Sequence, residues 1–164
     1  MPSAKKVRIG TALEHDAAWV HFASPYLLGP LREDLPGLAR RLRADGTGVS
    51  LDTNWDPSER WDTVAELVPE VDVLLPNRSE LEAIARALSV SHVHPAEAIS
   101  RLGPRVVVKD GARGGFSVSM AGPRIHAPGL AVDVVDTTGA GDSFDAGYIA
   151  AIAHDVTDEH ERLR

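Results

Sequence analysis

Short apolar runs alternate with amphipathic segments along this chain, and that alternation leaves few folds open to it. The apolar runs predict strands over 19–23, 49–52, 71–75 and 105–109. The segments between them predict helices over 31–42, 79–88 and 96–102. Two further short runs, 116–120 and 124–126, predict a hairpin around Ala121-Gly122-Pro123. Strands that alternate with helices form a mostly parallel sheet, so we expect an α/β fold.

A glycine-rich turn, Asp136-Thr137-Thr138-Gly139-Ala140-Gly141-Asp142-Ser143-Phe144, precedes the last helix that the sequence predicts. Gly139 and Gly141 can adopt backbone conformations closed to other residues, so successive amides can converge on one anion. The apolar stripe that begins at Phe144 places this turn at the positive end of a helix dipole. Asp142 beside such an anion could accept the proton of an attacking hydroxyl, or it could simply stabilise the helix start.

The same nine residues closely resemble the signature of the PfkB/ribokinase family of carbohydrate kinases. The turn is not a Walker A loop, since no Gly-Lys-Ser/Thr follows, and Phe144 stands where a dinucleotide motif would have its third glycine. The resemblance implies a ribokinase-like three-layer αβα sandwich that transfers the ATP γ-phosphoryl group to a sugar hydroxyl. It implies Asp142 as the general base, and an anion hole formed by the amides of Gly139, Ala140 and Gly141.

A second stretch, Asn77-Arg78-Ser79-Glu80, follows the strand that the sequence predicts over 71–75. It resembles the Asn-x-x-Glu motif of the family, in which the asparagine lies near the nucleotide and the glutamate helps to order Mg²⁺. Asn77 and Glu80 are also spaced as a capping box, which would explain both residues by helix initiation alone. The two interpretations are compatible.

The loop after the strand 105–109 has glycines spaced by three, at Gly111 and Gly114. It resembles the nucleotide-side loop of the family, but an ordinary Gly-rich hairpin entry would look the same. Lys109 at the strand end would add positive charge near the phosphates of ATP, or would simply be solvated.

Two other motifs are assigned through the resemblance. Asp52 and Asn54 match an Asp-x-Asn segment that contacts the sugar substrate together with Asp142, and they could also shape an Asx-type turn. The family often has an arginine soon after this asparagine, but this chain has Asp56, which argues against recognition of sugar acids. Asp136 and Thr138 match positions that help to bind a monovalent cation, so the likeness implies K⁺.

Composition narrows the choice of partner. The 164 residues carry a net charge of −7 and have no basic tract longer than Lys5-Lys6, which argues against nucleic acid as the main partner. No cysteine is present, the basic N-terminus is followed by no apolar signal region, and no membrane-length apolar run occurs. We therefore expect a cytoplasmic protein that binds ATP and a small sugar, with neither nucleic acid nor membrane as a partner.

The resemblance covers nearly the whole chain but only the later part of a PfkB kinase. The N-terminal lid and substrate portion of the family is absent, so we expect residues 1–164 to form a single, truncated domain. A homodimer or a complementing N-terminal portion is then a candidate partner. The alternative function is a non-catalytic, nucleotide-binding or regulatory remnant of a sugar kinase, and the sugar or nucleoside that would act as acceptor stays open.

Overall fold

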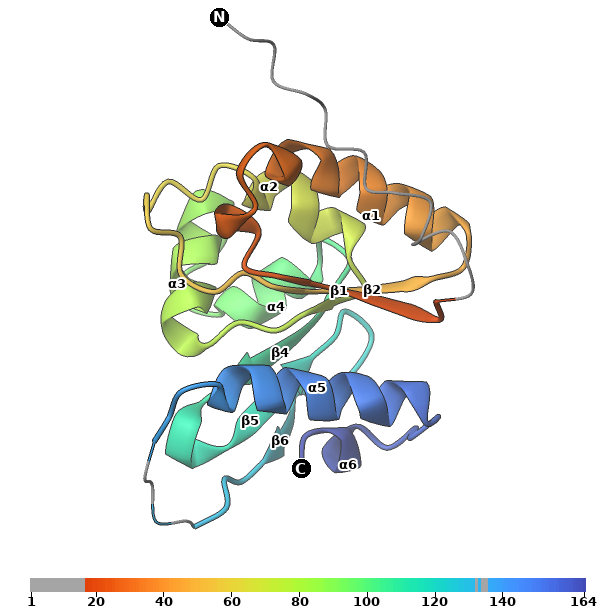
Figure 1. Ribbon diagram of the computed structural model, residues 1–164. Coiled ribbons are helices and arrows are strands. Elements are labelled where there is room, and N and C mark those ends of the chain that lie inside the picture. Colours follow the sequence, from red (N-terminus) through yellow and green to blue (C-terminus); the bar gives the residue numbers. More distant parts are fainter. Residues whose placement is uncertain (1–16, 132, 134–135) are drawn as a thin grey trace, which may run out of the picture.

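The computed structural model describes residues 17–131, 133 and 136–164, which form a six-stranded sheet between two layers of helices (Figure 1). The strands are β1 (Trp19–Ala23), β2 (Gly48–Asp52), β3 (Val73–Leu74), β4 (Arg105–Lys109), β5 (Gly115–Val118) and β6 (Ile125–Ala127). They lie in the order of the sequence; β1 to β4 run parallel, and β5 and β6 continue the sheet antiparallel. The carboxyl ends of four parallel strands therefore meet at one edge.

Four helices cover one face of the sheet: α1 (Leu35–Ala44), α2 (Val64–Leu67), α3 (Arg78–Ala87) and α4 (Pro95–Ser100). Short 3₁₀ turns lie at Pro25–Leu27, Gly29–Asp34, Val68–Glu70 and Gly111–Arg113. In α1, Leu35, Leu38 and Leu42 recur at helical spacing and are buried in the main core. Burial of such stripes against the sheet forms the larger of the two cores.

The opposite face carries α5 (Ala140–Ala153) and the short α6 (Glu159–Arg162), seen below the sheet in Figure 1. Strand β4 shows how the two cores are separated, because its alternate side chains point to opposite faces. Val106 and Val108 lie in the main core with α1 to α4, whereas Val107 packs in a second core with Tyr148 of α5. The three layers are therefore helices, sheet and helices.

Sequence-based expectations agree with most of this architecture. Strands 19–23 and 105–109 have the predicted bounds, the 116–120 and 124–126 hairpin is present as β5 and β6, and the predicted helices differ at their ends by a few residues. The predicted strand 71–75 is shorter, because Val73–Leu74 alone pair with the neighbouring strands. The short helices α2 and α6 were not expected, since four residues are too few to show a period.

No helix in the described part of the chain has the length and apolar character needed to cross a membrane.

Candidate active site

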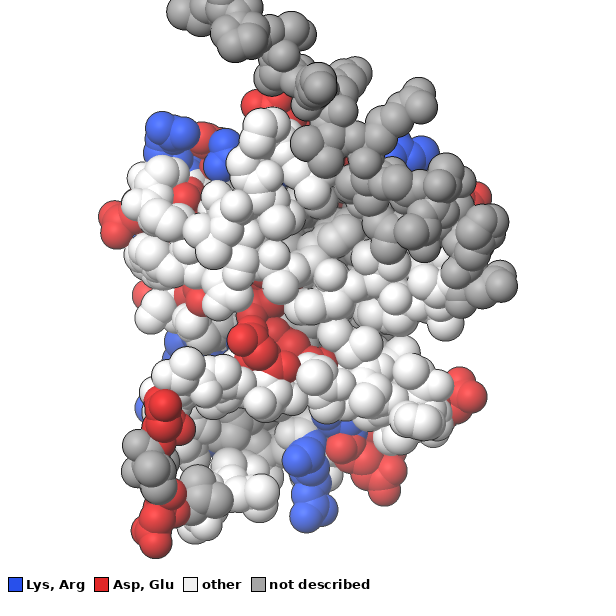
Figure 2. Space-filling model, in the orientation of Figure 1, with Lys and Arg blue, Asp and Glu red and all other residues white. Residues whose placement is uncertain are grey.

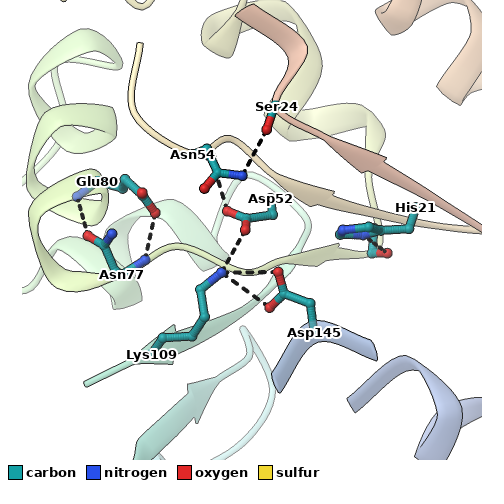
Figure 3. A network of polar contacts seen from close by, with 9 residues as sticks. His21, Ser24, Asp52, Asn54, Asn77, Glu80, Lys109 and Asp145 are labelled. Atoms are coloured by element: carbon teal, nitrogen blue, oxygen red, sulfur yellow. Dashed lines mark hydrogen bonds and ion pairs between the residues drawn. The ribbon is translucent and has the colours of Figure 1, made fainter. Parts of the chain in front are cut away.

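Polar side chains converge where the parallel strands end. Asp52 is the last residue of β2 and Lys109 the last of β4, while Asn77 follows β3 and forms a parallel bridge with Lys109. Figure 3 shows Lys109 pointing toward Asp52, with Asn77 beside them and Asp145 reaching in from α5. In open α/β sheets, ligands bind beyond the carboxyl ends of the strands, so this edge is the candidate active site.

A buried ion triad lies at the centre of this site. Lys109 Nζ lies 2.8 Å from Asp52 Oδ2 and 3.0 Å from Asp145 Oδ2. The side chain of Lys109 is only 13% exposed, so the alternative of a solvated lysine is wrong. Burial raises the pKa of Asp145, with Asp52 adding to the rise and Lys109 opposing it. The pKa of Lys109 is also raised, because the attraction of both carboxylates outweighs its desolvation.

The glycine turn lies at the start of α5, as the sequence predicts, but its two glycines differ. Gly141 lies inside α5 and has no positive φ, so the expectation of a special backbone conformation is wrong for that residue. Gly139 is the N-cap of α5 and has φ +74°, a left-handed conformation that favours glycine. A Cβ built on Gly139 would meet no atom within 4 Å, so the space beside the turn is open. A Cβ built on Gly141 would lie 3.6 Å from Lys109 Nζ, which places the turn beside the triad. Ala140 and Asp142 lie in the exposed first turn of the helix.

Asn77 and Glu80 form a complete capping box at the start of α3. The Asn77 side chain accepts from the Glu80 amide at 2.9 Å, and Glu80 Oε2 accepts from the Asn77 amide at 2.8 Å. The capping interpretation is therefore confirmed. Glu80 is 4% exposed, and burial raises the pKa of its carboxyl group. In Figure 3 Glu80 lies on the Asn77 side of Asp52 and Lys109, so capping leaves it near the site.

Hydrogen bonds to the Asp110 carboxylate hold the Gly111–Gly114 loop in place. Asp110 accepts bidentate hydrogen bonds from Arg78 and Arg113, including contacts of 2.6 Å and 2.7 Å. These guanidinium groups hold the pKa of Asp110 well below its usual range. A Cβ on Gly114 would clash with the Ala127 carbonyl oxygen, so glycine is required for the loop to pack against β6.

Asp52 and Asn54 form the Asx-type turn that the sequence allowed, with the Asn54 amide donating to Asp52 Oδ1 at 3.1 Å. The Asn54 side chain donates to Ser24 Oγ at 2.9 Å. Asp56 accepts from the Trp61 amide at 2.7 Å and so shapes its own loop.

The Asp136 and Thr138 pair forms another exposed turn, in which the Thr138 amide donates to Asp136 Oδ1 at 2.8 Å. This bond lowers the pKa of Asp136. Asp136 and Thr138, the two residues expected to supply oxygen ligands to a cation, are therefore exposed at the surface next to the start of α5.

Two residues of the site were missed from the sequence. Asp145 lies on the buried side of α5, and a charged residue inside the otherwise apolar stretch 144–153 was the signal for it. His21 in β1 shares Ser50 Oγ with Trp19, at 2.8 Å and 2.9 Å. Burial lowers the pKa of His21, while Asp52 opposes that shift. A lone histidine in an apolar run gave no sign that β1 borders the site.

Acidic side chains gather in the hollow between α5 and the layer above it (Figure 2). Within residues 17–131, 133 and 136–164, no three His, Cys, Asp or Glu side chains are grouped as they would be around a metal ion. The Glu80 carboxylate nevertheless suits Mg²⁺. This ion favours hard oxygen ligands and is held by one or two carboxylates together with substrate phosphates.

Known proteins resemble this chain in sequence and in fold. It is 37% identical over 99 residues to a 1-phosphofructokinase of Haloferax volcanii, covering 58% of this chain and 32% of that protein. It is 32% identical over 152 residues to an aminoimidazole riboside kinase of Salmonella typhimurium, covering 88% and 47%. The crystal structure of an aminoimidazole riboside kinase from Salmonella enterica, with aminoimidazole riboside and an ATP analogue, superposes with a TM-score of 0.70 at 28% identity, covering 88% of this chain and 50% of that one.

The chain thus spans about a third to a half of the length of these relatives. Its fold is the ribokinase-like sandwich that the sequence predicted. Residues 11–161 match the family described as pfkB family carbohydrate kinase, and the chain belongs to that family.

Proposed function

We propose that this chain carries the catalytic half of an ATP-dependent carbohydrate kinase. One observation carries the proposal: the left-handed Gly139 turn at the N-terminus of α5, with Asp142 in its first turn, lies at the edge of the sheet where Asp52 and Lys109 end their strands. That arrangement offers an anion-binding helix terminus and a carboxylate at the place where an α/β sheet binds its ligand.

The chemical step is the transfer of the γ-phosphoryl group to a sugar hydroxyl. The hydroxyl oxygen forms a bond to the γ-phosphorus as the bond to the ADP oxygen breaks, and the hydroxyl proton passes to the Asp142 carboxylate. The amides of Gly139 and Gly141 stabilise the negative charge on the transferred group. The Ala140 amide, which donates to the Thr137 carbonyl oxygen at 3.1 Å, would join them by exchanging that bond for one to the transferred group. The open space beside Gly139 leaves room for that group.

The nucleotide side of the site is formed by Asn77, Lys109, Gly111 and Gly114. The Gly111–Gly114 loop presents backbone close to the end of β4, and its fastening by Asp110 keeps it in place. Glu80 would hold Mg²⁺ or its waters. Bound Mg²⁺ would supply positive charge to the phosphate oxygens. Asp136 and Thr138 would contribute oxygen donors to a K⁺ site beside the turn.

The sugar side is assigned to Asp52 and Asn54, with Asp142 at the reacting hydroxyl. The Asx turn and the bond to Ser24 hold both side chains in place. The relatives named above are kinases of a sugar phosphate and of a riboside, which supports a small sugar derivative as the acceptor class. We assign residues 1–164 to a single partial domain, whose partner would be a second copy or a complementing N-terminal portion.

Calorimetric titration with a non-hydrolysable ATP analogue, with and without Mg²⁺, tests this proposal. We expect Mg²⁺-dependent binding that Glu80→Gln weakens, and turnover on a panel of sugars that Asp142→Asn abolishes with little change in melting temperature. Wild-type turnover by Asp142→Asn would refute the assignment of the base. Binding without turnover, even after the N-terminal portion of a relative is added, would instead identify a nucleotide-binding remnant.

A further inference from the structure

Lys109 connects three elements of the site through one ammonium group (Figure 3). Its Nζ contacts Asp52 Oδ2 at the end of β2, and it contacts both carboxylate oxygens of Asp145 in α5, at 3.0 Å and 3.2 Å. Both aspartate side chains are only 2% exposed. A single buried cation therefore links β2, β4 and α5.

Stability alone does not explain this triad. Charges are costly to remove from water, and apolar side chains of similar volume often replace a buried ion pair with no loss of stability. The cost is greater here because one ammonium group faces two carboxyl groups. The triad instead restricts the orientation of α5 relative to the sheet, because its hydrogen bonds form only within a narrow range of distance and angle.

The remaining contacts of α5 with its surroundings are less directional. The side chains that pack α5 into the second core are apolar or aromatic: Phe144, Tyr148 and Ile152. The Tyr148 hydroxyl donates to Glu159 in α6 and not to the sheet. Within the described part of the chain, the bonds of Asp145 to Lys109 are the side-chain hydrogen bonds that join α5 to the sheet.

The triad lies directly against the part of α5 that would act on the substrate. Asp145 is less than one helical turn beyond Asp142, so a displacement of Asp145 also displaces the proposed base. Lys109 Nζ is 3.6 Å from the position of a Cβ on Gly141, inside the turn proposed as the anion hole.

We propose that Lys109 and Asp145 are positioning residues, which hold the first turn of α5 so that Asp142 and the Gly139–Gly141 turn face the carboxyl edge of the sheet. The effect on turnover rests on the proposed kinase function. The effect on the position of α5 does not, and it can be measured without any substrate.

The main test is amide hydrogen exchange across residues 143–147 in Asp145→Ala, because the helical hydrogen bonds of α5 begin with the Ser143 amide. This variant leaves Lys109 paired with Asp52 and so strands no buried charge. We expect exchange in this segment to be at least tenfold faster, with amides of β4 unchanged. Ser143→Ala is the matched control, because Ser143 lies in the same turns but is exposed. Unchanged exchange in Asp145→Ala would overturn the proposal.

A second variant separates positioning from stability. Lys109→Met combined with Asp145→Leu and Asp52→Asn replaces all three charged groups with neutral side chains and leaves no buried charge unpaired, so we expect a melting temperature near that of the wild type but the same fast exchange in α5. A triple variant that keeps wild-type protection would equally overturn the proposal, because neutral side chains would then position the helix as well as the charges do.

Kinetics supply the functional readout. If the wild type phosphorylates a sugar, Asp145→Ala should lower kcat by about 10²-fold with little change in the KM for ATP, because misplacement of a reacting group by about 1 Å has that effect. An unchanged kcat would refute positioning. If the wild type neither binds ATP nor turns over, the proposed function fails, and the exchange comparison alone decides the role of the triad.

Discussion

Alanine at position 139 should damage the site far more than it damages the fold. Gly139 has φ +74°, where an L-residue costs about 1–2 kcal/mol, and an added Cβ would meet no atom within 4 Å, so that conformational cost is the whole penalty to stability. For a domain of this size, about 1 kcal/mol corresponds to about 2–4 °C, so the melting temperature should fall by about 2–8 °C.

Gly139→Ala should affect function more than stability, because relief of the backbone strain moves the amides of the proposed anion hole. Rotation of the substituted residue towards negative φ turns the amides that follow it, and the new Cβ occupies the open space beside the turn. Loss of one donor from an oxyanion hole typically lowers kcat by about 10²–10³-fold. We therefore expect a loss of that order in a coupled kinase assay and weaker binding of the ATP analogue in calorimetry.

Gly46 provides the matched control for this prediction. It has φ +83°, its added Cβ also meets nothing within 4 Å, and it lies in the turn between α1 and β2. Gly46→Ala should lower the melting temperature by a similar amount and leave ATP-analogue binding unchanged. If Gly139→Ala binds and turns over as Gly46→Ala does, the assignment of an anion hole to this turn is wrong.

Three further predictions address loop, core and pH dependence. Gly114→Ala should weaken ATP-analogue binding in calorimetry, because its Cβ would clash with the Ala127 carbonyl oxygen; unchanged affinity would remove this loop from the nucleotide site. Tyr148→Phe should cost about 1.5–3 kcal/mol in chemical denaturation, since the buried Glu159 carboxylate loses a 2.7 Å hydrogen bond; a smaller cost would mean that Arg105 and Arg162 suffice. Burial raises the pKa of Asp145 above its unfolded value of 3.8, so the folded state holds a proton that the unfolded chain has lost, and stability falls as the pH rises above that value. Asp145→Asn should flatten this fall in thermal unfolding scans, and an unchanged slope would contradict the raised pKa.

The sequence was enough to predict the sheet, the helices that carry a clear stripe and the turn at Gly139, because each depends on local preferences. Strand 105–109 is one apolar run, and its ends follow from the flanking polar residues. The Asn77 and Glu80 spacing predicted both the capping box and a place beside the strand ends.

Tertiary pairing could not be predicted in the same way. Lys109 and Asp145 are separated by 36 residues, and a lysine at a strand end is usually solvated, so nothing local predicted that they would meet in the interior. His21 enters the site only because β1 lies beside β2 in the sheet, which fixes its position next to Ser50. Contacts of this kind depend on which strands and helices lie side by side in the fold, and the local sequence does not contain that information.

The capping box of α3 also has an entropic consequence for the carboxylate proposed to meet Mg²⁺. A free glutamate side chain loses up to about 2 kcal/mol of rotamer freedom when it is immobilised. Glu80 has already lost that freedom during folding, because its own helix terminus holds it through the Asn77 amide. Binding of an ion would therefore begin from a ligand with fixed orientation, and affinity at this site would depend on how well one helix end is formed.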